Sequence, residues 1–385
     1  MAAKPDVIVV GAGILGAWTA FFLRRQGART LLLDAWEPGH LRATSSDESR
    51  VLRCGYGPRR LYTRWAWEAL ALWKHWQQAW GVQLFHRVGV LWMHESENEF
   101  AATSLAALRE ESIPVEPLAP EEFARRFPQI SPAGISVAYL EPEAGALSAR
   151  QGVRTVVQQL VAAGGEFQLA RVEPVAEKRG SKLEEVRLAD GKRLAAGSFV
   201  FACGPWLPQL FPDELGNFIR VTRQEVFYFG TPPGDARFSA GHMPAWLMEN
   251  YYGIPSLAGR GFKMAEDEVG PPFDPTTGDR VASEAVAVRV REQLARRFPA
   301  LKDAPLLEAR VCQYESTADG HLLLDRHPAW ENVWLVGGGS GHSFKLGPKV
   351  GSVAAVAVAG TAIELPPELR LQPRTPSGAR PTLTD

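Results

Sequence analysis

The feature that most constrains this chain is a glycine-rich turn close to its beginning. Residues 11–16 read Gly-Ala-Gly-Ile-Leu-Gly, follow an apolar run expected to be a buried strand at 6–10, and open a helical pattern at 14–26. Asp34 ends a second expected strand at 30–34, 18 residues after the last of these glycines. Glycines permit a tight turn and close approach to a pyrophosphate, the helix N-terminus attracts phosphate, and an acid can bind ribose hydroxyls. The motif predicts a dinucleotide-binding βαβ unit rather than a merely structural turn, with four candidate cofactor-binding residues: Gly11, Gly13, Gly16 and Asp34.

Composition excludes several classes of protein. The 385 residues carry 42 Lys and Arg against 43 Asp and Glu, and this balance argues against a nucleic-acid-binding protein. The 45% hydrophobic and 22% charged content is that of a globular chain long enough for two or three domains. Three scattered cysteines are too few for a disulfide framework or a cysteine metal site. An uncharged run at 7–23 is broken by glycines and lacks the flanks of a signal peptide, so we expect a cytoplasmic protein with no membrane partner.

The rest of the chain alternates helical and strand patterns. A helix is expected at 60–81 with Trp73, Trp76 and Trp80 along one face, which is more typical of an aromatic core than of a ligand-stacking surface. Beyond residue 364 the chain is rich in proline and has little periodicity, which predicts a loosely attached strap. The remaining patterns indicate strands at 83–93, 219–230 and 243–264, helices at 97–112, 148–163 and 283–297, a buried strand running into glycines at 332–341, and a small-residue helix at 349–360.

Three further segments indicate which class of dinucleotide-binding protein this chain resembles. Residues 44–53 place two arginines after a polar loop, residues 311–314 read Val-Cys-Gln-Tyr, and residues 338–345 read Gly-Gly-Ser-Gly-His-Ser-Phe-Lys. With these segments the chain resembles the D-amino-acid-oxidase superfamily of flavoproteins, and within it the family of monomeric sarcosine oxidase and N-methyltryptophan oxidase, over residues 5 to about 365. The resemblance implies an α/β flavoprotein with a discontinuous Rossmann-type FAD-binding domain and a substrate domain with a mainly antiparallel sheet. The implied boundaries are 1–82, 145–218 and 321–385 for the first domain, and 83–144 and 219–320 for the second.

The same resemblance implies which residues hold FAD. In that family a cysteine two residues before a tyrosine forms a thioether with the 8α-methyl group of the flavin, and Cys312 stands at that position. From composition alone, Cys312 would be a small core residue. Arg50 is expected near the flavin ring, and the amides of residues 341–344, with the helix that follows, are expected to face the electron-rich end of the ring rather than form a mere turn. Further cofactor contacts are implied for Ile14, Thr44, Ser45, Val172, Gly204, Trp206, Gly339, Gly341, His342, Phe344 and Lys345.

The resemblance also assigns residues to the substrate. Arg53 and Lys345, which composition alone would take as surface charges, are implied to bind the substrate carboxylate, since a guanidinium fork and an ammonium suit that group. Lys263 alternates with apolar neighbours on an expected strand, and an inward lysine is costly to bury without a function. In the family, the lysine at this position lies on the flavin face and accelerates the reaction of reduced flavin with oxygen. Tyr252 and Tyr314 are implied to line the pocket, although either could equally be a core residue.

The sequence departs from the sarcosine oxidase pattern at Asp267. Four residues after the lysine, that enzyme carries a pocket histidine, whereas this chain carries an aspartate. Residues 263, 265 and 267 of a continuous strand would point to the same face, so Asp267 would add negative charge beside the substrate. We therefore expect a substrate other than N-methylglycine, unless the strand ends early and Asp267 is solvated. Ser45 and Ser46 also replace family histidines, but they still offer hydroxyls to phosphate or ribose.

The implied reaction is the FAD-dependent oxidation of a secondary-amine amino acid. Hydride passes to the flavin, the resulting imine is hydrolysed, and oxygen is reduced to hydrogen peroxide; no metal is needed. The expected partners are the amino acid and oxygen, and the expected state is a monomer.

Two alternatives stay open. A flavin dehydrogenase would use another electron acceptor, against which Lys263 argues, and a non-catalytic flavin-binding subunit would not need the pair of Arg53 and Lys345.

Overall fold

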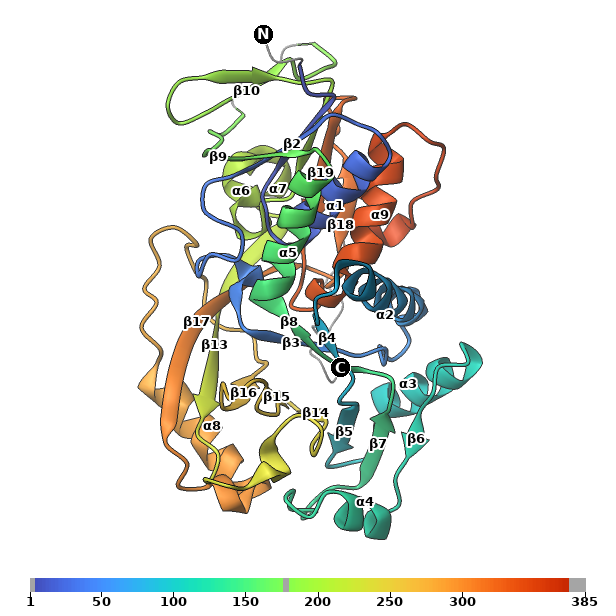
Figure 1. The fold of residues 1–385 in the computed structure, drawn as a ribbon, viewed down its shortest axis with the longest axis vertical. Helices are drawn as coiled ribbons and strands as arrows, with labels where there is room; N and C mark the ends of the chain where they lie inside the picture. The colour runs from blue at the N-terminus through green and yellow to red at the C-terminus, as the bar shows by residue number, and fades with distance from the viewer. Residues whose placement is uncertain (1–3, 176–179, 374–385) are drawn as a thin grey trace.

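The computed structural model of the protein describes residues 4–175 and 180–373. Figure 1 shows an elongated molecule in which one large sheet lies in each half, so the α/β class expected from the sequence is confirmed. Within the described residues, no helix is both long and apolar enough to pass through a bilayer.

The first half is built on a six-stranded sheet. In spatial order its strands are β18 (Leu323–Arg326), β19 (Val333–Gly337), β12 (Ser198–Phe201), β1 (Val7–Val10), β2 (Thr30–Asp34) and β9 (Glu166–Leu169). Neighbouring strands run parallel, except that β18 is antiparallel to β19. The two central strands, β12 and β1, are buried almost throughout, because the faces of a parallel sheet are covered. One face carries α1 (Ile14–Arg25), which packs against α5 (Ala149–Ala162) and α9 (Gly347–Val358) (Figure 1).

The second half is built on an eight-stranded, mainly antiparallel sheet. In spatial order its strands are β17 (Leu306–Thr317), β13 (Ile219–Phe229), β16 (Phe262–Glu266), β15 (Tyr251–Ile254), β14 (Ala245–Met248), β5 (Val90–His94), β7 (Val137–Glu141) and β6 (Glu116–Pro117). The pairing of β14 with β5 is parallel, and the other pairs are antiparallel. The long strands β13 and β17 reach from this sheet toward the first half of the molecule (Figure 1). The helices α3 (Glu99–Glu110), α4 (Pro120–Arg126) and α8 (Glu284–Arg297) belong to this half.

Smaller elements complete the fold. A three-stranded sheet contains β3 (Ser49–Leu52), β8 (Gly145–Ser148) and β4 (Phe85–His86), and a two-stranded sheet contains β10 (Glu185–Arg187) and β11 (Arg193–Ala195). The remaining helices are α2 (Arg60–Trp80), α6 (Leu207–Leu210) and α7 (Pro212–Leu215), with short 3-10 turns η1 (Thr44–Ser46), η2 (Gly204–Trp206), η3 (Ala236–Phe238), η4 (Pro299–Leu301), η5 (Phe344–Leu346) and η6 (Pro367–Leu369).

The boundaries expected near the N-terminus are close to those observed, and later ones differ where turns interrupt a strand pattern. The expected strand at 83–93 is divided into β4 and β5, because Gly89 adopts a positive φ of 78° between them. The expected strand region at 243–264 contains β14, β15 and β16, and Glu249 lies at a positive φ of 44° in the first of its turns. The last helix begins at Gly347, two residues earlier than expected. The exact division into two domains stays a prediction.

The tryptophans of α2 form part of the core, as the sequence indicated. Trp73 is fully buried and packs edge to face on Trp18 of α1, with ring centroids 5.4 Å apart. Trp76 and Trp80 are half-buried and complete the same aromatic cluster.

The expected C-terminal strap is in part a packed segment. Leu365 and Leu369 are buried, and the backbone N–H of Leu371 donates to Asp325 at 2.8 Å. The expectation of loose attachment is therefore wrong for this stretch, because two apolar side chains anchor it. Residues 374–385 of the expected strap lie outside the described part of the chain.

Candidate functional site

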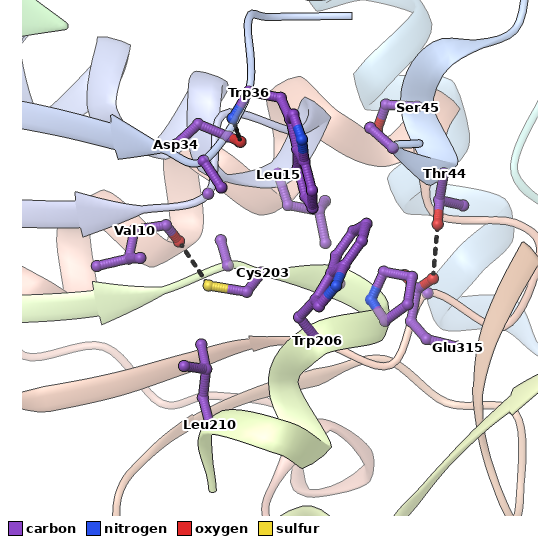
Figure 2. A pocket seen from close by; sticks show the side chains of 18 of the residues that line it. Val10, Leu15, Asp34, Trp36, Thr44, Ser45, Cys203, Trp206, Leu210 and Glu315 are labelled. Atoms are coloured by element: carbon purple, nitrogen blue, oxygen red, sulfur yellow. Dashed lines mark hydrogen bonds between the residues drawn. The ribbon is translucent and has the colours of Figure 1, made fainter. Parts of the chain in front are cut away.

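The carboxyl ends of the parallel strands open into a cavity of about 420 Å³ (Figure 2). Its wall comes from the glycine-rich turn after β1, the end of β2, the turn η1, the η2 segment after β12, and the glycines after β19. Ligands of open α/β sheets bind at this edge of the sheet. The position of the cavity agrees with the dinucleotide site predicted from residues 11–16.

Two glycines of the turn are required by close backbone contacts. Gly11 has a φ of +104°, and a Cβ atom there would lie 2.4 Å from the carbonyl oxygen of Ala202. A Cβ atom on Gly16 would lie 1.9 Å from the carbonyl oxygen of Gly11. These contacts bring α1 and β12 against the turn, so its backbone faces the cavity without side chains in between. Gly11, Gly13 and Ile14 line the cavity, while Gly16 lies behind it.

Asp34 holds the same turn from the neighbouring strand. Its carboxylate accepts hydrogen bonds from the backbone N–H of Ala12 at 2.6 Å and of Trp36 at 2.9 Å. Ser45 accepts from the N–H of Ile14 at 3.1 Å, which partly satisfies the first turn of α1. Asp34 and Ser45 both line the cavity, but in this structure they bind the protein's own amides. A contact of Asp34 with ribose stays a prediction.

Two indole rings lie at one side of the cavity. Figure 2 shows Trp36 and Trp206 projecting toward each other, and their ring centroids are 4.9 Å apart. The indole N–H of Trp206 donates to Thr276 Oγ1 at 2.9 Å, and Thr276 belongs to the segment between β16 and α8. The second half of the molecule thus contributes to the rim of a cavity built mainly by the first half. Sequence reasoning named Trp206 but missed Trp36 and Thr276.

Glu315 is a buried acid in this cavity that sequence reasoning also missed. It lies on β17, three residues after Cys312, and accepts a hydrogen bond from Thr44 Oγ1 at 3.3 Å (Figure 2). Burial raises the pKa of Glu315 to about 7, although the hydrogen bonds from Thr44 and the Gly339 amide oppose the shift. An acid with this pKa changes its charge near neutral pH. The sequence feature that could have identified Glu315 is a charged residue within an apolar strand pattern.

A second, smaller cavity of about 40 Å³ adjoins the first. Four residues line both cavities: Arg50, Tyr314, Gly341 and Phe344. The second cavity is lined in addition by Arg53, Tyr252, Cys312, His342 and Lys345, all of them predicted site residues. A planar group that extended from the dinucleotide site would therefore reach the place where these side chains gather.

Two buried cations meet at one end of the second cavity. Arg53 lies between the rings of Tyr56 and Trp92, with its guanidinium carbon 4.3 Å and 5.1 Å from the two ring centroids, and donates to the carbonyl oxygen of Gly55. Lys345 Nζ lies 4.9 Å from the centroid of Tyr56 and donates to the carbonyl oxygen of His342 at 3.2 Å. Each is only 3% exposed, and neither forms an ion pair with a carboxylate among the described residues.

This pair of cations creates a site for an anion. Burial, reinforced by the charge of Arg53, holds the pKa of Lys345 well below its usual value. A bound carboxylate would oppose both effects, because an opposite charge favours the protonated amine. Burial and the charge of Lys345 lower the pKa of His342, so its ring adds no third positive charge to the site.

Glu141 positions the chain around Arg53. Its carboxylate accepts hydrogen bonds from the N–H groups of Cys54 at 2.6 Å and Gly55 at 3.0 Å, and from the indole N–H of Trp92 at 2.7 Å. These bonds fix both the turn that follows Arg53 and one of the rings against which it packs. Glu141 comes from β7, far away in the sequence, and no local pattern marked it.

Cys312 lies beside Arg50 at the wall of the second cavity. The distance from Arg50 Nη2 to Cys312 Sγ is 3.9 Å. Burial raises the pKa of the thiol, whereas the charge of Arg50 lowers it. Cys54 is fully buried away from both cavities, while Cys203 lines the first one.

Lys263 and Asp267 are both buried, as their positions on the strand predicted. Lys263 lines neither cavity; its ammonium donates to Asp47 and to the carbonyl oxygen of Ser49 at 2.9 Å. Asp267 directly follows β16 and is 4% exposed, so the alternative of a solvated side chain is wrong. It accepts a hydrogen bond at 3.1 Å from Tyr314, which lines both cavities.

The predicted cofactor residues therefore divide between two places. The first cavity is lined by Gly11, Gly13, Ile14, Asp34, Thr44, Ser45, Arg50, Val172, Gly204, Trp206, Gly339, Gly341 and Phe344. The second cavity, and not the first, is lined by Cys312, His342 and Lys345.

Comparisons with known proteins agree with this geometry. A family model described as FAD dependent oxidoreductase matches residues 6–356. The monomeric sarcosine oxidase of Bacillus sp. (strain B-0618) is 30% identical over 359 residues, which cover 90% of each chain. The N-methyl-L-tryptophan oxidase of Yersinia pestis (strain Pestoides F) is 25% identical over 362 residues, covering 91% of this chain and 94% of the relative. The crystal structure of L-proline dehydrogenase from P. horikoshii shares the fold, with a TM-score of 0.83 at 18% identity, covering 95% of this chain and 96% of that one.

The burial of Glu315 predicts a pH dependence of stability. Its pKa is higher in the folded chain than in the unfolded chain, where it is near the usual 4.5. The folded state binds the extra proton, so this residue destabilises the ligand-free protein as pH rises from about 4.5 to about 7, by up to about 3 kcal/mol. Glu315→Gln should raise the denaturant midpoint at pH 8 and change it little at pH 5. An equal shift at both pH values would contradict this origin.

Proposed function

This chain belongs to the FAD-dependent oxidoreductase family, and on that premise we propose that it oxidises N-substituted amino acids. The observation that carries the proposal is the pair of buried cations, Arg53 and Lys345, at the end of a small cavity that adjoins the dinucleotide cavity. Such a pair suits the carboxylate of an amino acid. Sarcosine and N-methyltryptophan, which the relatives' names give as substrates, are amino acids of this kind.

The residues of the first cavity fit FAD. The bare backbone of Gly11 and the N-terminus of α1 suit a pyrophosphate, and the cavity continues to Arg50 and Phe344, where it adjoins the second cavity. Bound FAD supplies a two-electron acceptor for the hydride of the substrate and passes those electrons on to oxygen, which becomes hydrogen peroxide. We propose Cys312 as its covalent attachment point, through a thioether to the 8α-methyl group. This bond would replace the S–H bond of the thiol and one C–H bond of the methyl group, and the two electrons and two protons released would pass by way of the flavin to oxygen.

The protein's own residues then orient the substrate. Arg53 and Lys345 bind its carboxylate, and the ring of Tyr56, which packs on both cations, keeps water from them. Tyr252 and Tyr314 enclose the amine, which must be uncharged when hydride leaves, because the nitrogen lone pair assists that step. The product imine is then hydrolysed to an amine and a carbonyl compound.

We further propose that oxygen is the electron acceptor, that Lys263 assists its reaction, and that the protein acts as a cytoplasmic monomer with the domain boundaries inferred from its sequence.

The test of the function is a panel of N-methyl, cyclic, fructosyl and primary amino acids, scored by flavin bleaching without oxygen. We expect the N-substituted members to bleach the flavin, and peroxide to form when air is admitted. Bleaching without peroxide would instead indicate a dehydrogenase, and no bleaching by any amino acid would refute the proposal.

Covalent attachment is tested by acid precipitation. The pellet of the holoenzyme should stay yellow, and Cys312→Ala should release the colour into the supernatant. Cys203→Ala is a matched control, because Cys203 lines the adjoining first cavity, and this variant should keep the colour in the pellet. Free FAD in the supernatant of the unmodified protein would rule out the thioether.

The carboxylate site is tested by removing one cation at a time. Removal of one partner of a buried charge interaction should weaken binding of a small carboxylic acid roughly 30- to several-thousand-fold. Arg53→Ala and Lys345→Ala should both show this loss in a titration that follows the flavin spectrum. Lys349→Ala removes a nearby surface cation that pairs with Glu68, and should leave the affinity unchanged. Unchanged acid binding in both site variants would refute the assignment.

Asp267 is proposed to direct specificity away from sarcosine. Its buried carboxylate, bonded to Tyr314, adds negative charge beside the substrate and favours a polar or cationic N-substituent. Asp267→His should increase the kcat/KM for sarcosine relative to bulkier substrates, whereas Glu268→Gln, an exposed neighbour, should not. Efficient sarcosine oxidation that Asp267→His leaves undisturbed would show that this residue does not set specificity.

A further inference from the structure

Asp47 is a buried carboxylate at the centre of a charged cluster. It lies between η1 and β3, where one of its oxygens accepts from Lys263 Nζ and from Arg50 Nη1 at 2.7 Å. Its other oxygen accepts from the hydroxyl of Tyr228 at 2.6 Å and from the N–H of Glu48 at 2.8 Å. Although burial raises the pKa of Asp47, the charges of Lys263 and Arg50 outweigh it and lower the pKa below its usual value. Asp47 is therefore ionised at neutral pH.

Lys263 depends on this carboxylate for its charge. Burial lowers the pKa of Lys263 from 10.5 to about 8, and the charge of Arg50 acts in the same direction. Asp47 is the group that most strongly opposes these effects, both by its charge and by its hydrogen bond. Without Asp47, a fully buried amine next to a guanidinium would lose its proton well below pH 8.

The cluster lies directly behind the wall that faces the two cavities. Arg50 lines both of them, and the ring centroid of Tyr252, in the second cavity, lies 5.5 Å from Lys263 Nζ. The groups that face Lys263 come from every element around it: Asp47, Arg50 of β3, Tyr228 of β13, Tyr252 of β15, and Cys312 of β17. Arg310 of β17 lies 3.7 Å from the carboxylate of Asp47 and pairs mainly with Glu308 and Glu48.

We propose that Asp47 is a positioning residue that keeps Lys263 protonated behind this wall and thereby sets the pH range in which the reduced enzyme reacts with oxygen. The proposal rests on the proposed function, since it takes oxygen as the acceptor. Oxygen takes two electrons from the reduced cofactor and two protons, from the cofactor and from solvent, to give hydrogen peroxide. A fixed cation stabilises the negative charge that oxygen acquires with the first electron. Asp47 never touches oxygen and acts only through Lys263.

The first experiment follows reoxidation of the photoreduced holoenzyme by oxygen, from about pH 6 to about pH 9, across the range in which Lys263 titrates. In the unmodified protein the rate should fall as pH rises through about 8. Asp47→Asn should shift this fall to lower pH and slow reoxidation at pH 7 by about tenfold or more, toward the rate of Lys263→Met. Glu48→Gln removes the neighbouring acid, which does not contact Lys263, and should keep the original profile.

The second experiment needs neither oxygen nor cofactor. Lys263 has a lower pKa in the folded chain than in the unfolded chain, so the unfolded state binds more protons and stability increases as pH rises above about 8. In ligand-free Asp47→Asn, the increase should begin at a lower pH. The double variant Asp47→Asn/Lys263→Met should lose the contribution of Lys263 and keep only that of other buried amines such as Lys345, and its reoxidation rate should equal that of Lys263→Met alone.

The double variant also keeps the test decisive where Asp47→Asn folds poorly. If loss of the counter-ion of Lys263 is the cause, removing the lysine charge as well should recover part of the lost stability, because only Arg50 is then left without its carboxylate. Unchanged pH profiles in Asp47→Asn, faster reoxidation, or additive losses in the double variant would overturn the proposal. Because photoreduction needs no substrate, these outcomes are separate from a failure of the amino acid panel, which would refute only the proposed function.

Discussion

The site depends on buried positive charge, and the rest of the structure is arranged around the cost of burying it. Arg50, Arg53, Lys263 and Lys345 lie within two small cavities or directly behind their walls. Moving an isolated cation from water into a protein interior is expensive, so each needs a partner. Asp47 supplies one for Arg50 and Lys263. Arg53 and Lys345 have aromatic rings and carbonyl oxygens instead, which leaves their charge available to an anion.

The fold brings these groups together from distant parts of the chain. Arg53 follows a strand of the small three-stranded sheet, Lys263 is on the eight-stranded sheet, and Lys345 follows the last parallel strand. Strands β13 and β17 extend between the two large sheets, and Cys312 and Glu315 lie on β17. A shift of either half relative to the other would separate the cations from the dinucleotide cavity. The proposed reaction therefore requires that the two halves keep the relative position seen here.

The residues of the site that could be predicted from the sequence are those that lie close together in it. The βαβ unit could be predicted because its turn, strands and acid are close in sequence and are required by backbone geometry at Gly11 and Gly16. Arg53, Lys345 and Cys312 were found only through a family resemblance. The acids around the site, Asp47, Glu141 and Glu315, were missed, because tertiary contacts and not local sequence patterns place them there. Alternation on a strand indicated that Lys263 is buried, and a buried lysine requires a partner, but no pattern could identify Asp47.

The acids at the site thus have two different roles. Asp47 and Glu141 are bound by several donors each, and they fix the cations and the turn of the chain that present the site. Glu315 has fewer donors and lines the first cavity; burial raises its pKa, as it also raises that of Glu141. Among the cations, Lys345 resembles Glu315, since burial lowers its pKa more than the nearby acids Glu141 and Asp267 raise it. The ligand-free protein is therefore least stable at the groups that face its cavities, which is the usual relation between stability and function, and ligands that satisfy these groups should stabilise the whole fold.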